Sequence, residues 1–332
     1  MKQKKFRAMV VDAPDSRSCS RSIQEKTVDE LPEGDVLIRV HYSSLNYKDA
    51  LSATCNRGVT RKYPHTPGID AAGVVVESAG GTFAAGERVI VTSYDLGMNT
   101  PGGFGQYVRV PAEWVVPLPE GLSLRKSMAY GTAGFTAGMS VYEVTGRVGR
   151  TAGNILVTGA SGGVGSLAVA ILAKLGYPVV AASGKPGSAA FLTALGAREI
   201  VGRDAVLDAG GKPLLKSRWA GAVDTVGGDI LSTVVKSMDV GGTVACCGNV
   251  AGANLDLTVF PFILRGVRLI GIDSQSCPMA HRLKIWEKLA GEWGVDMEDD
   301  LCREISLDQL DENIERILAG EQTGRVLVNL DR

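Results

Sequence analysis

The chain has 332 residues, of which 45% are hydrophobic and 21% are charged. This length predicts about two domains, and the composition is rich enough in apolar residues to bury large cores. With 35 basic and 36 acidic residues the net charge is −1, which gives no electrostatic reason to expect nucleic acid or an anionic membrane as a partner.

The first residues, MKQKKFRAMVVDAP, are basic, but their apolar run is too short for a signal sequence. No stretch approaches the roughly 18 apolar residues of a membrane-spanning helix, so we expect a soluble, cytoplasmic protein that binds no membrane. The cysteines and histidines lack the paired short spacing of a zinc site, which predicts no metal and reduced, mostly buried thiols. The cysteines are Cys19, Cys55, Cys246, Cys247, Cys277 and Cys302.

From Lys5 to about Pro117, short segments with strand character are bounded by glycine and proline. Many short strands with such turns favour a compact, barrel-like β domain. The strand segments are VLIRVHYSSL (36–45), GIDAAGVVVESAG (68–80), GERVIVTSY (86–94) and GGFGQYVRVPAEWVVPLP (102–119).

The stretch SSLNYKDAL, residues 43–51, places Asn46, Tyr47, Lys48 and Asp49 in a row of hydrogen-bonding side chains. One interpretation is a helix start, with Asn46 as N-cap and Asp49 near the positive end of the helix dipole. The other interpretation is a polar cluster at the floor of an active site. The two do not exclude each other, and the local sequence leaves both open.

The pattern changes near Ser123, where residues 122–144 have a helical period and strands and helices then alternate. Apolar runs separated by helices are typical of a parallel sheet covered on both faces, which predicts a doubly wound nucleotide-binding domain. The strand segments are NILVTGA (154–160), PVVAAS (178–183), EIVGR (199–203), GAVDTVGG (221–228), GTVACCGNV (242–250) and VRLIGID (267–273).

The C-terminal segments 279–293, 311–322 and 324–330 read as two helices and a closing strand, and they resemble the first domain more than another βα unit. We therefore expect residues 1–125 and 275–332 to form one domain and residues 126–274 to form the nucleotide-binding domain. The sixth strand of the parallel sheet is apolar and edge-like, which predicts a homodimer.

The glycine-rich stretch ILVTGASGGVGSLAV, residues 155–169, places a tight turn between a strand and a helix. In the fingerprint G-x-G-x-x-G/A, Ala160 takes the first position, Gly162 the second and Gly165 the third. The second glycine lets the backbone approach a pyrophosphate at the helix N-terminus, and the third lets the helix pack on the sheet. A glycine turn that serves only packing is the alternative. The predicted dinucleotide contacts are Ala160, Ser161, Gly162, Gly163 and Val164.

The choice between NADH and NADPH depends on whether an acidic residue follows the glycine-rich turn. NAD enzymes usually carry an Asp or Glu about 20 residues after the turn, to hold the ribose 2′-hydroxyl. No acidic residue lies between Ser166 and Arg198. Instead, Ser183, Gly184 and Lys185 offer a hydroxyl, a backbone N–H and a cation where a 2′-phosphate would lie, so we predict NADPH. A solvated loop lysine is the alternative for Lys185.

The whole chain resembles the zinc-free medium-chain dehydrogenase/reductases of the quinone oxidoreductase branch. This implies a Rossmann doubly wound parallel sheet plus a GroES-like β-barrel catalytic domain. Where the zinc enzymes have a cysteine ligand and a Gly-His-Glu, this chain has Asn46 and Gly68-Ile69-Asp70, which implies metal-free chemistry. The supporting stretches are NYKD, PHTPGIDAAGVV, GERVIVTSY, GGFGQYVRVP, GTAGFTAGMSV, GASGGVGSLAV and GRVLVNL.

Within the family, SSLNYKDALS, YGTAGFTAGMSV and LIGIDSQSCPMAHRLKIWEKLA resemble the acryloyl-CoA reductases. This narrower resemblance implies NADPH-dependent reduction of the α,β double bond of acryloyl-CoA or a similar short enoyl-CoA, so the expected partner is an acyl-CoA or another conjugated carbonyl. An NADPH:quinone or 2-alkenal oxidoreductase is the alternative enzyme, and a non-catalytic NADPH-binding protein is the third interpretation.

The resemblance also suggests roles for individual residues. Asn46 would donate a hydrogen bond to the developing enolate or orient the nicotinamide ribose. Tyr47 would donate a hydrogen bond or a proton, and Asp49 would orient its neighbours or cap the helix. Arg325 would reach a phosphate or the substrate carbonyl, with an exposed arginine as the alternative.

On the cofactor side, Thr132 would lie near the nicotinamide and Asn249 would flank the cofactor. A helix-capping hydroxyl and a turn asparagine are the respective alternatives. Tyr94 and Arg57 are further candidates for the substrate cleft.

Overall fold

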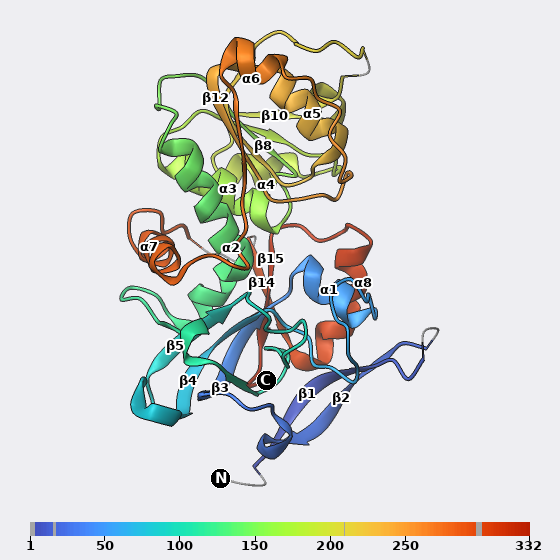
Figure 1. Ribbon diagram of the computed structural model, residues 1–332, viewed down its shortest axis with the longest axis vertical. Helices are drawn as coiled ribbons and strands as arrows, with labels where there is room; N and C mark the ends of the chain where they lie inside the picture. The colour runs from blue at the N-terminus through green and yellow to red at the C-terminus, as the bar shows by residue number, and fades with distance from the viewer. Residues whose placement is uncertain (1–3, 16–17, 209, 297–300) are drawn as a thin grey trace. The chain divides into compact units, whose positions relative to one another are not determined.

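The computed structural model describes residues 1–332 except 1–3, 16–17, 209 and 297–300. The chain folds into two compact units (Figure 1). The first unit comprises Met1–Thr132, Gln275–Ala290 and Met297–Arg332, and the second comprises Ala133–Ser274 and Gly291–Asp296. Helix α2 (Leu124–Thr145) begins in the first unit and continues into the second, and it contains a non-helical residue at Gly131.

The first unit contains a seven-stranded sheet to which both ends of the chain contribute. Strand β15, near the C-terminus, pairs antiparallel with β3 and parallel with β14. The C-terminal segment therefore completes the sheet that the N-terminal segment begins. In spatial order the strands are β14 (Cys302–Ser306), β15 (Arg325–Asn329), β3 (Val36–Ser44), β4 (Asp70–Ser78), β5 (Arg88–Thr92) and β7 (Val116–Pro117), and β6 (Tyr107–Val110) pairs with β3.

A two-stranded antiparallel sheet, β1 (Lys5–Asp12) with β2 (Ser20–Thr27), also belongs to this unit. Its helices are α1 (Tyr47–Ala53), α7 (Met279–Ala290) and α8 (Leu310–Leu318), and α1 packs against α8. Short 3-10 turns lie at Val28–Glu30, Ala79–Gly81, Ala112–Trp114 and Leu307–Gln309.

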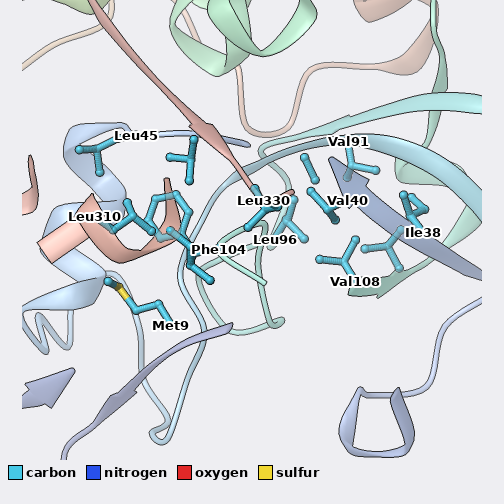
Figure 2. Close-up of a cluster of buried hydrophobic side chains, with 14 of the residues drawn as sticks. Met9, Ile38, Val40, Leu45, Val91, Leu96, Phe104, Val108, Leu310 and Leu330 are labelled. Carbon is cyan, nitrogen blue, oxygen red and sulfur yellow. The ribbon is translucent and has the colours of Figure 1, made fainter. Parts of the chain in front are cut away.

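Alternating side chains of these strands form the core of the first unit (Figure 2). Along β3, Val36, Ile38 and Val40 point inward and are almost completely buried. Burying one such side chain contributes roughly 1.5–3 kcal/mol of apolar transfer free energy. Phe104 and Leu310 join the same cluster from segments far apart in the sequence, so the core connects the N-terminal strands to the C-terminal helix α8.

The second unit contains a six-stranded parallel sheet in the spatial order β10-β9-β8-β11-β12-β13. Numbered along this unit, that is the order 3-2-1-4-5-6 of a dinucleotide-binding doubly wound sheet, and the predicted fold class is confirmed. The strands are β8 (Ile155–Thr158), β9 (Val179–Ala182), β10 (Glu199–Val201), β11 (Trp219–Asp224), β12 (Met238–Cys246) and β13 (Arg268–Gly271). The helices are α3 (Gly163–Lys174), α4 (Ala189–Ala194), α5 (Gly228–Lys236) and α6 (Phe260–Arg265), with a 3-10 turn at Arg203–Val206.

The prediction of reduced thiols is wrong for two cysteines. Cys19 and Cys55 form a disulfide whose Cα atoms are 6.0 Å apart, although 36 residues separate them in sequence. The bond ties the loop after β1 to the end of α1. Spacing could not reveal it, because the fold alone brings these two loops together. Cys246, Cys247, Cys277 and Cys302, all among the described residues, form no disulfide. No helix in the described part of the chain is long and apolar enough to cross a membrane.

Candidate active site

The polar stretch that begins at Asn46 belongs to a buried hydrogen-bonded cluster in the first unit. We call it the Asp49–Asp70 cluster, and its members come from five separate elements. Except for the half-buried Thr132, each member is at least nine-tenths buried. The members are Ser44 at the end of β3, Asn46 and Asp49 at the start of α1, Asp70 at the start of β4, Thr132 in α2 and Arg325 at the start of β15.

Asp70 is the centre of this cluster. Its Oδ2 accepts hydrogen bonds from Ser44 Oγ (2.5 Å) and Asn46 Nδ2 (2.8 Å). The backbone N–H of Thr132 lies 3.0 Å from both carboxylate oxygens, and the Thr132 hydroxyl donates to Oδ1 at 2.6 Å. A buried carboxylate is costly unless it is hydrogen-bonded, and these donors satisfy both of its oxygens.

Asp49 is the second carboxyl group of the cluster. Its Oδ1 accepts from the backbone N–H of Ile69 (2.8 Å), and its Oδ2 accepts from the backbone N–H (2.8 Å) and the side-chain amide (3.1 Å) of Asn46. Burial and the nearby charge of Asp70 raise the pKa of Asp49 to about 7, against the opposing effect of these hydrogen bonds. The fold therefore holds a carboxyl group that exchanges its proton near neutral pH.

The helix start predicted at Asn46 is confirmed. Asn46 is the residue before α1, with an extended backbone (φ −120°), and Asp49 binds its N–H. The Asn46 side chain is turned toward the cluster. Its Nδ2 lies within hydrogen-bonding distance of Ser44 O, Asp49 Oδ2 and Asp70 Oδ2, while its Oδ1 accepts from Arg325 at 3.3 Å. The amide N–H groups of Asn46 thus bind the carboxyl groups of Asp49 and Asp70. These are the same N–H groups that we expected to donate to an enolate.

Arg325 is buried, which excludes the exposed arginine of the alternative interpretation. Its guanidinium donates to Ser44 Oγ (2.8 Å), to Asn46 Oδ1 and to the backbone carbonyls of Ala129 (3.1 Å) and Leu45 (3.4 Å). Burial lowers its pKa, and the charge of Asp70 opposes that effect. Because Ser44 and Asn46 also bind the carboxyl groups of the cluster, the guanidinium supplies positive charge beside Asp49 and Asp70.

Gly131 marks a position in this cluster that the sequence analysis missed. Its φ is 52°, and a Cβ at this residue would lie 2.4 Å from Ser44 Oγ and 2.5 Å from Asp70 Oδ2. Only glycine fits there, because the backbone passes directly against the cluster. Asp70 and Ser44 were also missed as site residues. Asp70 carried a usable signal, since it is the charged residue that opens the otherwise apolar run DAAGVVV.

Tyr47 and Lys48 point away from the cluster's interior. Tyr47 is 45% exposed, and within the described ranges no residue hydrogen-bonds its hydroxyl. Lys48 donates to Gln275 Oε1 at 2.9 Å. Of the two predicted donors Asn46 and Tyr47, Asn46 is buried in the cluster and Tyr47 is exposed.

The glycine-rich turn lies in the second unit, between β8 and α3. A Cβ at Gly165 would lie 2.3 Å from the carbonyl oxygen of Gly159, which has a φ of 58°, so the strand-to-helix approach requires glycine here. Helix α3 begins at Gly163 and presents its N-terminal N–H groups at this turn. Ser161 Oγ lies 3.0 Å from Ser183 Oγ, so the turn contacts the end of β9. These features fit a bound pyrophosphate.

The segment after β9 also fits a phosphate. Ser183 and Lys185 are half-buried, and burial lowers the pKa of the Lys185 ammonium. A Cβ at Gly184 would lie 3.8 Å from side-chain carbons of Arg203, a second cation that the sequence analysis missed. The sequence did offer a signal for Arg203, because it is a basic residue just after the third strand of the parallel sheet. Asn249 is exposed after β12, and the parallel strand order puts it at the same sheet edge as the glycine turn.

Comparisons with known proteins agree with this geometry. Residues 32–120 match the alcohol dehydrogenase GroES-like domain, and residues 163–289 match the zinc-binding dehydrogenase domain. The chain is 44% identical to acrylyl-CoA reductase AcuI of Ruegeria pomeroyi, over 98% of this chain and 99% of that protein. The chain belongs to the medium-chain dehydrogenase/reductase family. As a member of this family it is an oxidoreductase.

Solved structures of medium-chain dehydrogenase/reductases support the same assignment. The yhdH oxidoreductase of Salmonella enterica, in complex with NADP, superimposes with a TM-score of 0.94 at 42% identity, over 97% of this chain and 99% of that one. Bacillus subtilis protein yhfP, with NAD bound, has a TM-score of 0.95 at 43% identity, over 98% and 99%. Among the described residues no group of His, Cys, Asp and Glu could hold a metal ion, so they do not fit a zinc site.

Proposed function

We propose that this medium-chain dehydrogenase/reductase reduces the α,β double bond of acryloyl-CoA or a similar short enoyl-CoA to the saturated acyl-CoA. The protein is an NADPH-dependent oxidoreductase that acts on a carbon–carbon double bond. The observation that carries the substrate proposal is its nearly full-length similarity, at 44% identity, to a relative named acrylyl-CoA reductase. The division of labour that we propose puts cofactor binding in the second unit and the polar catalytic cluster in the first.

The residues after β9 support NADPH over NADH. Ser183, Lys185 and Arg203 supply a hydroxyl and two cations for the 2′-phosphate, and no carboxylate occurs between Ser166 and Arg198 to repel it. The backbone of the glycine turn and the N-terminus of α3 would hold the pyrophosphate. When bound, NADPH supplies the hydride that adds to the β-carbon of the substrate.

We propose that Tyr47 supplies the matching proton to the α-carbon. The hydroxyl is exposed, so water can return a proton to it after each turnover. The Asp49–Asp70 cluster acts through the backbone, because it fixes the first turn of α1, on which Tyr47 stands. Hydride and proton together saturate the double bond, and the thioester is unchanged.

An assay with acryloyl-CoA and NADPH tests the proposal, with loss of the nicotinamide absorbance as the measurement. We expect turnover of acryloyl-CoA in preference to free quinones and 2-alkenals. Turnover of quinones alone would assign a quinone oxidoreductase instead, and NADPH binding without turnover of any acceptor would assign a binding protein. Tyr47→Phe should lower kcat and retain NADPH binding, whereas the matched variant Tyr42→Phe, on β3 and outside the cluster, should resemble the wild type.

We further propose that the protein is a homodimer that pairs through β13. This strand stands at the end of the parallel sheet order, so one of its edges is available for a second copy. Apolar side chains are exposed nearby, and their exposed fractions range from 41% to 71% for Val250, Val259, Phe260, Ile263 and Leu264. Sedimentation of the wild type as a dimer and of Ile263→Asp as a monomer would support this arrangement. A monomeric wild type at micromolar concentration would exclude it.

A further inference from the structure

The backbone turn after β5 is strained at two consecutive residues. Within the described part of the chain three residues other than glycine have a positive φ, and Ser93 (64°) and Tyr94 (51°) are adjacent. The left-handed region is unfavourable for any residue with a Cβ, and a bulky aromatic residue is rare there. Glycine or asparagine would form the same turn at lower cost, so the side chain of Tyr94 must account for its presence.

The turn is attached directly to the Asp49–Asp70 cluster. The N–H of Ser93 donates to the carbonyl of Ile69 at 2.7 Å, and Ser93 Oγ lies 2.9 Å from Thr132 Oγ1. The same Thr132 hydroxyl donates to Asp70. Tyr94 therefore stands one residue away from a hydrogen-bonded path into the centre of the cluster.

The ring of Tyr94 is held by two large side chains. The ring of Trp114 stacks against it, with centroids 5.5 Å apart and planes inclined by 6°. The guanidinium carbon of Arg282 lies 4.3 Å from the centroid of the Tyr94 ring. Both contacts are of kinds that favour aromatic rings, so the half-buried ring is fixed in one orientation.

Arg282 is itself fixed. It is fully buried on α7, and its Nη1 donates to the carbonyl (3.0 Å) and the hydroxyl (2.9 Å) of Thr92. Burial lowers the pKa of its guanidinium, because a buried cation loses its hydration. A buried cation and two strained residues thus support one aromatic ring that is itself only half-buried.

We propose that Tyr94 determines which acyl groups the enzyme accepts, by forming a rigid wall against the end of a short acyl chain. This inference rests on the proposed function. A ring that can rotate would yield to a longer acyl chain, whereas a ring held between an indole and a guanidinium excludes it. In this proposal the half-buried ring contacts the vinyl group of a three-carbon acyl chain, and additional methylenes would collide with it.

The experiment compares kcat/KM for acryloyl-CoA and trans-2-hexenoyl-CoA in the wild type, Tyr94→Ala and Tyr94→Phe. Tyr94→Ala should raise the ratio of hexenoyl-CoA to acryloyl-CoA turnover by at least about tenfold, because several methylenes gain space. Tyr94→Phe keeps the ring and should keep the wild-type ratio, with or without a loss of overall rate.

The outcomes separate the two proposals. A wild type that reduces no enoyl-CoA overturns the proposed function and this inference with it. An active wild type whose substrate ratio is unchanged in Tyr94→Ala overturns this inference alone, because a purely structural residue would lower both rates equally. If Tyr94→Ala does not fold, Tyr94→Leu provides the smaller truncation, and an unchanged ratio in that variant would also reject the wall.

Discussion

Asp49 predicts an unusual pH dependence of stability. Burial and the charge of Asp70 raise the pKa of Asp49 to about 7 in the folded protein, from an ordinary 3.8. The folded state therefore binds this proton more tightly than the unfolded state. Binding of this proton to Asp49 stabilises the folded state relative to the unfolded state. That contribution is fully present below about pH 4, is lost as the pH rises from about 4 to about 7, and changes no further above that range.

The magnitude follows from the size of the shift. One unit of pKa corresponds to about 1.4 kcal/mol, so a shift of roughly three units corresponds to roughly 4 kcal/mol over the whole range. At pH 5, the lower end of a practical range from pH 5 to pH 8, Asp49 of the unfolded chain is already mostly ionised. The part that remains measurable in that interval is about 2–3 kcal/mol of unfolding free energy.

Urea unfolding of the wild type and of Asp49→Asn at pH 5 and pH 8 measures this difference. Asparagine keeps an acceptor for the N–H of Ile69 but does not titrate. The wild type should lose about 2–3 kcal/mol more than Asp49→Asn when the pH is raised. Glu33→Gln, which replaces an exposed carboxylate, should behave as the wild type does. Equal losses in the wild type and in Asp49→Asn would refute the assignment of a proton to Asp49 at neutral pH.

Four other substitutions test other parts of the structure. Arg325→Met leaves buried acceptors without a donor and should lower the unfolding free energy by about 3–5 kcal/mol; a loss near zero would contradict its buried role. Gly165→Val should weaken NADP binding in calorimetry while the parallel sheet stays folded, and unchanged affinity would show that the turn tolerates a side chain. Cys55→Ser should cost about 4 kcal/mol in non-reducing urea titrations, because the Cys19 disulfide closes a long loop, and a reductant should reproduce this loss in the wild type. Lys185→Glu should raise KM for NADPH about tenfold or more and leave KM for NADH nearly unchanged, whereas equal effects would remove Lys185 from the phosphate site.

The sequence predicted features whose determinants lie close together along the chain. The glycine turn is one, because strand, turn and helix fall within 155–169 and each glycine has a local steric reason. The parallel, doubly wound sheet of the second unit was predictable from the same local alternation of strands and helices, whereas its strand order came from the structure. The helix start at Asn46 was also predictable, since the N-cap and the acidic residue Asp49 lie only three positions apart in sequence.

The Asp49–Asp70 cluster could only be predicted in part, because it depends on pairing between distant segments. Arg325 reaches Ser44 only because β15 pairs with β3, and sequence spacing gives no measure of that register. Asp70 is the charged residue that opens an apolar strand, but the sequence does not show which donors bind it. The disulfide was not predicted for the same reason, since Cys19 and Cys55 belong to different loops.

The position of β15 in the chain has a consequence for the newly made protein. The ribosome translates this strand after every strand of the parallel sheet, so the second unit can fold while the first is still unfinished. Until Arg325 emerges, the two carboxyl groups of Asp49 and Asp70 have no guanidinium beside them. Assembly of the first unit therefore waits for the last strand, and molecules whose synthesis stops before β15 should be recognised by cellular proteases as incompletely folded.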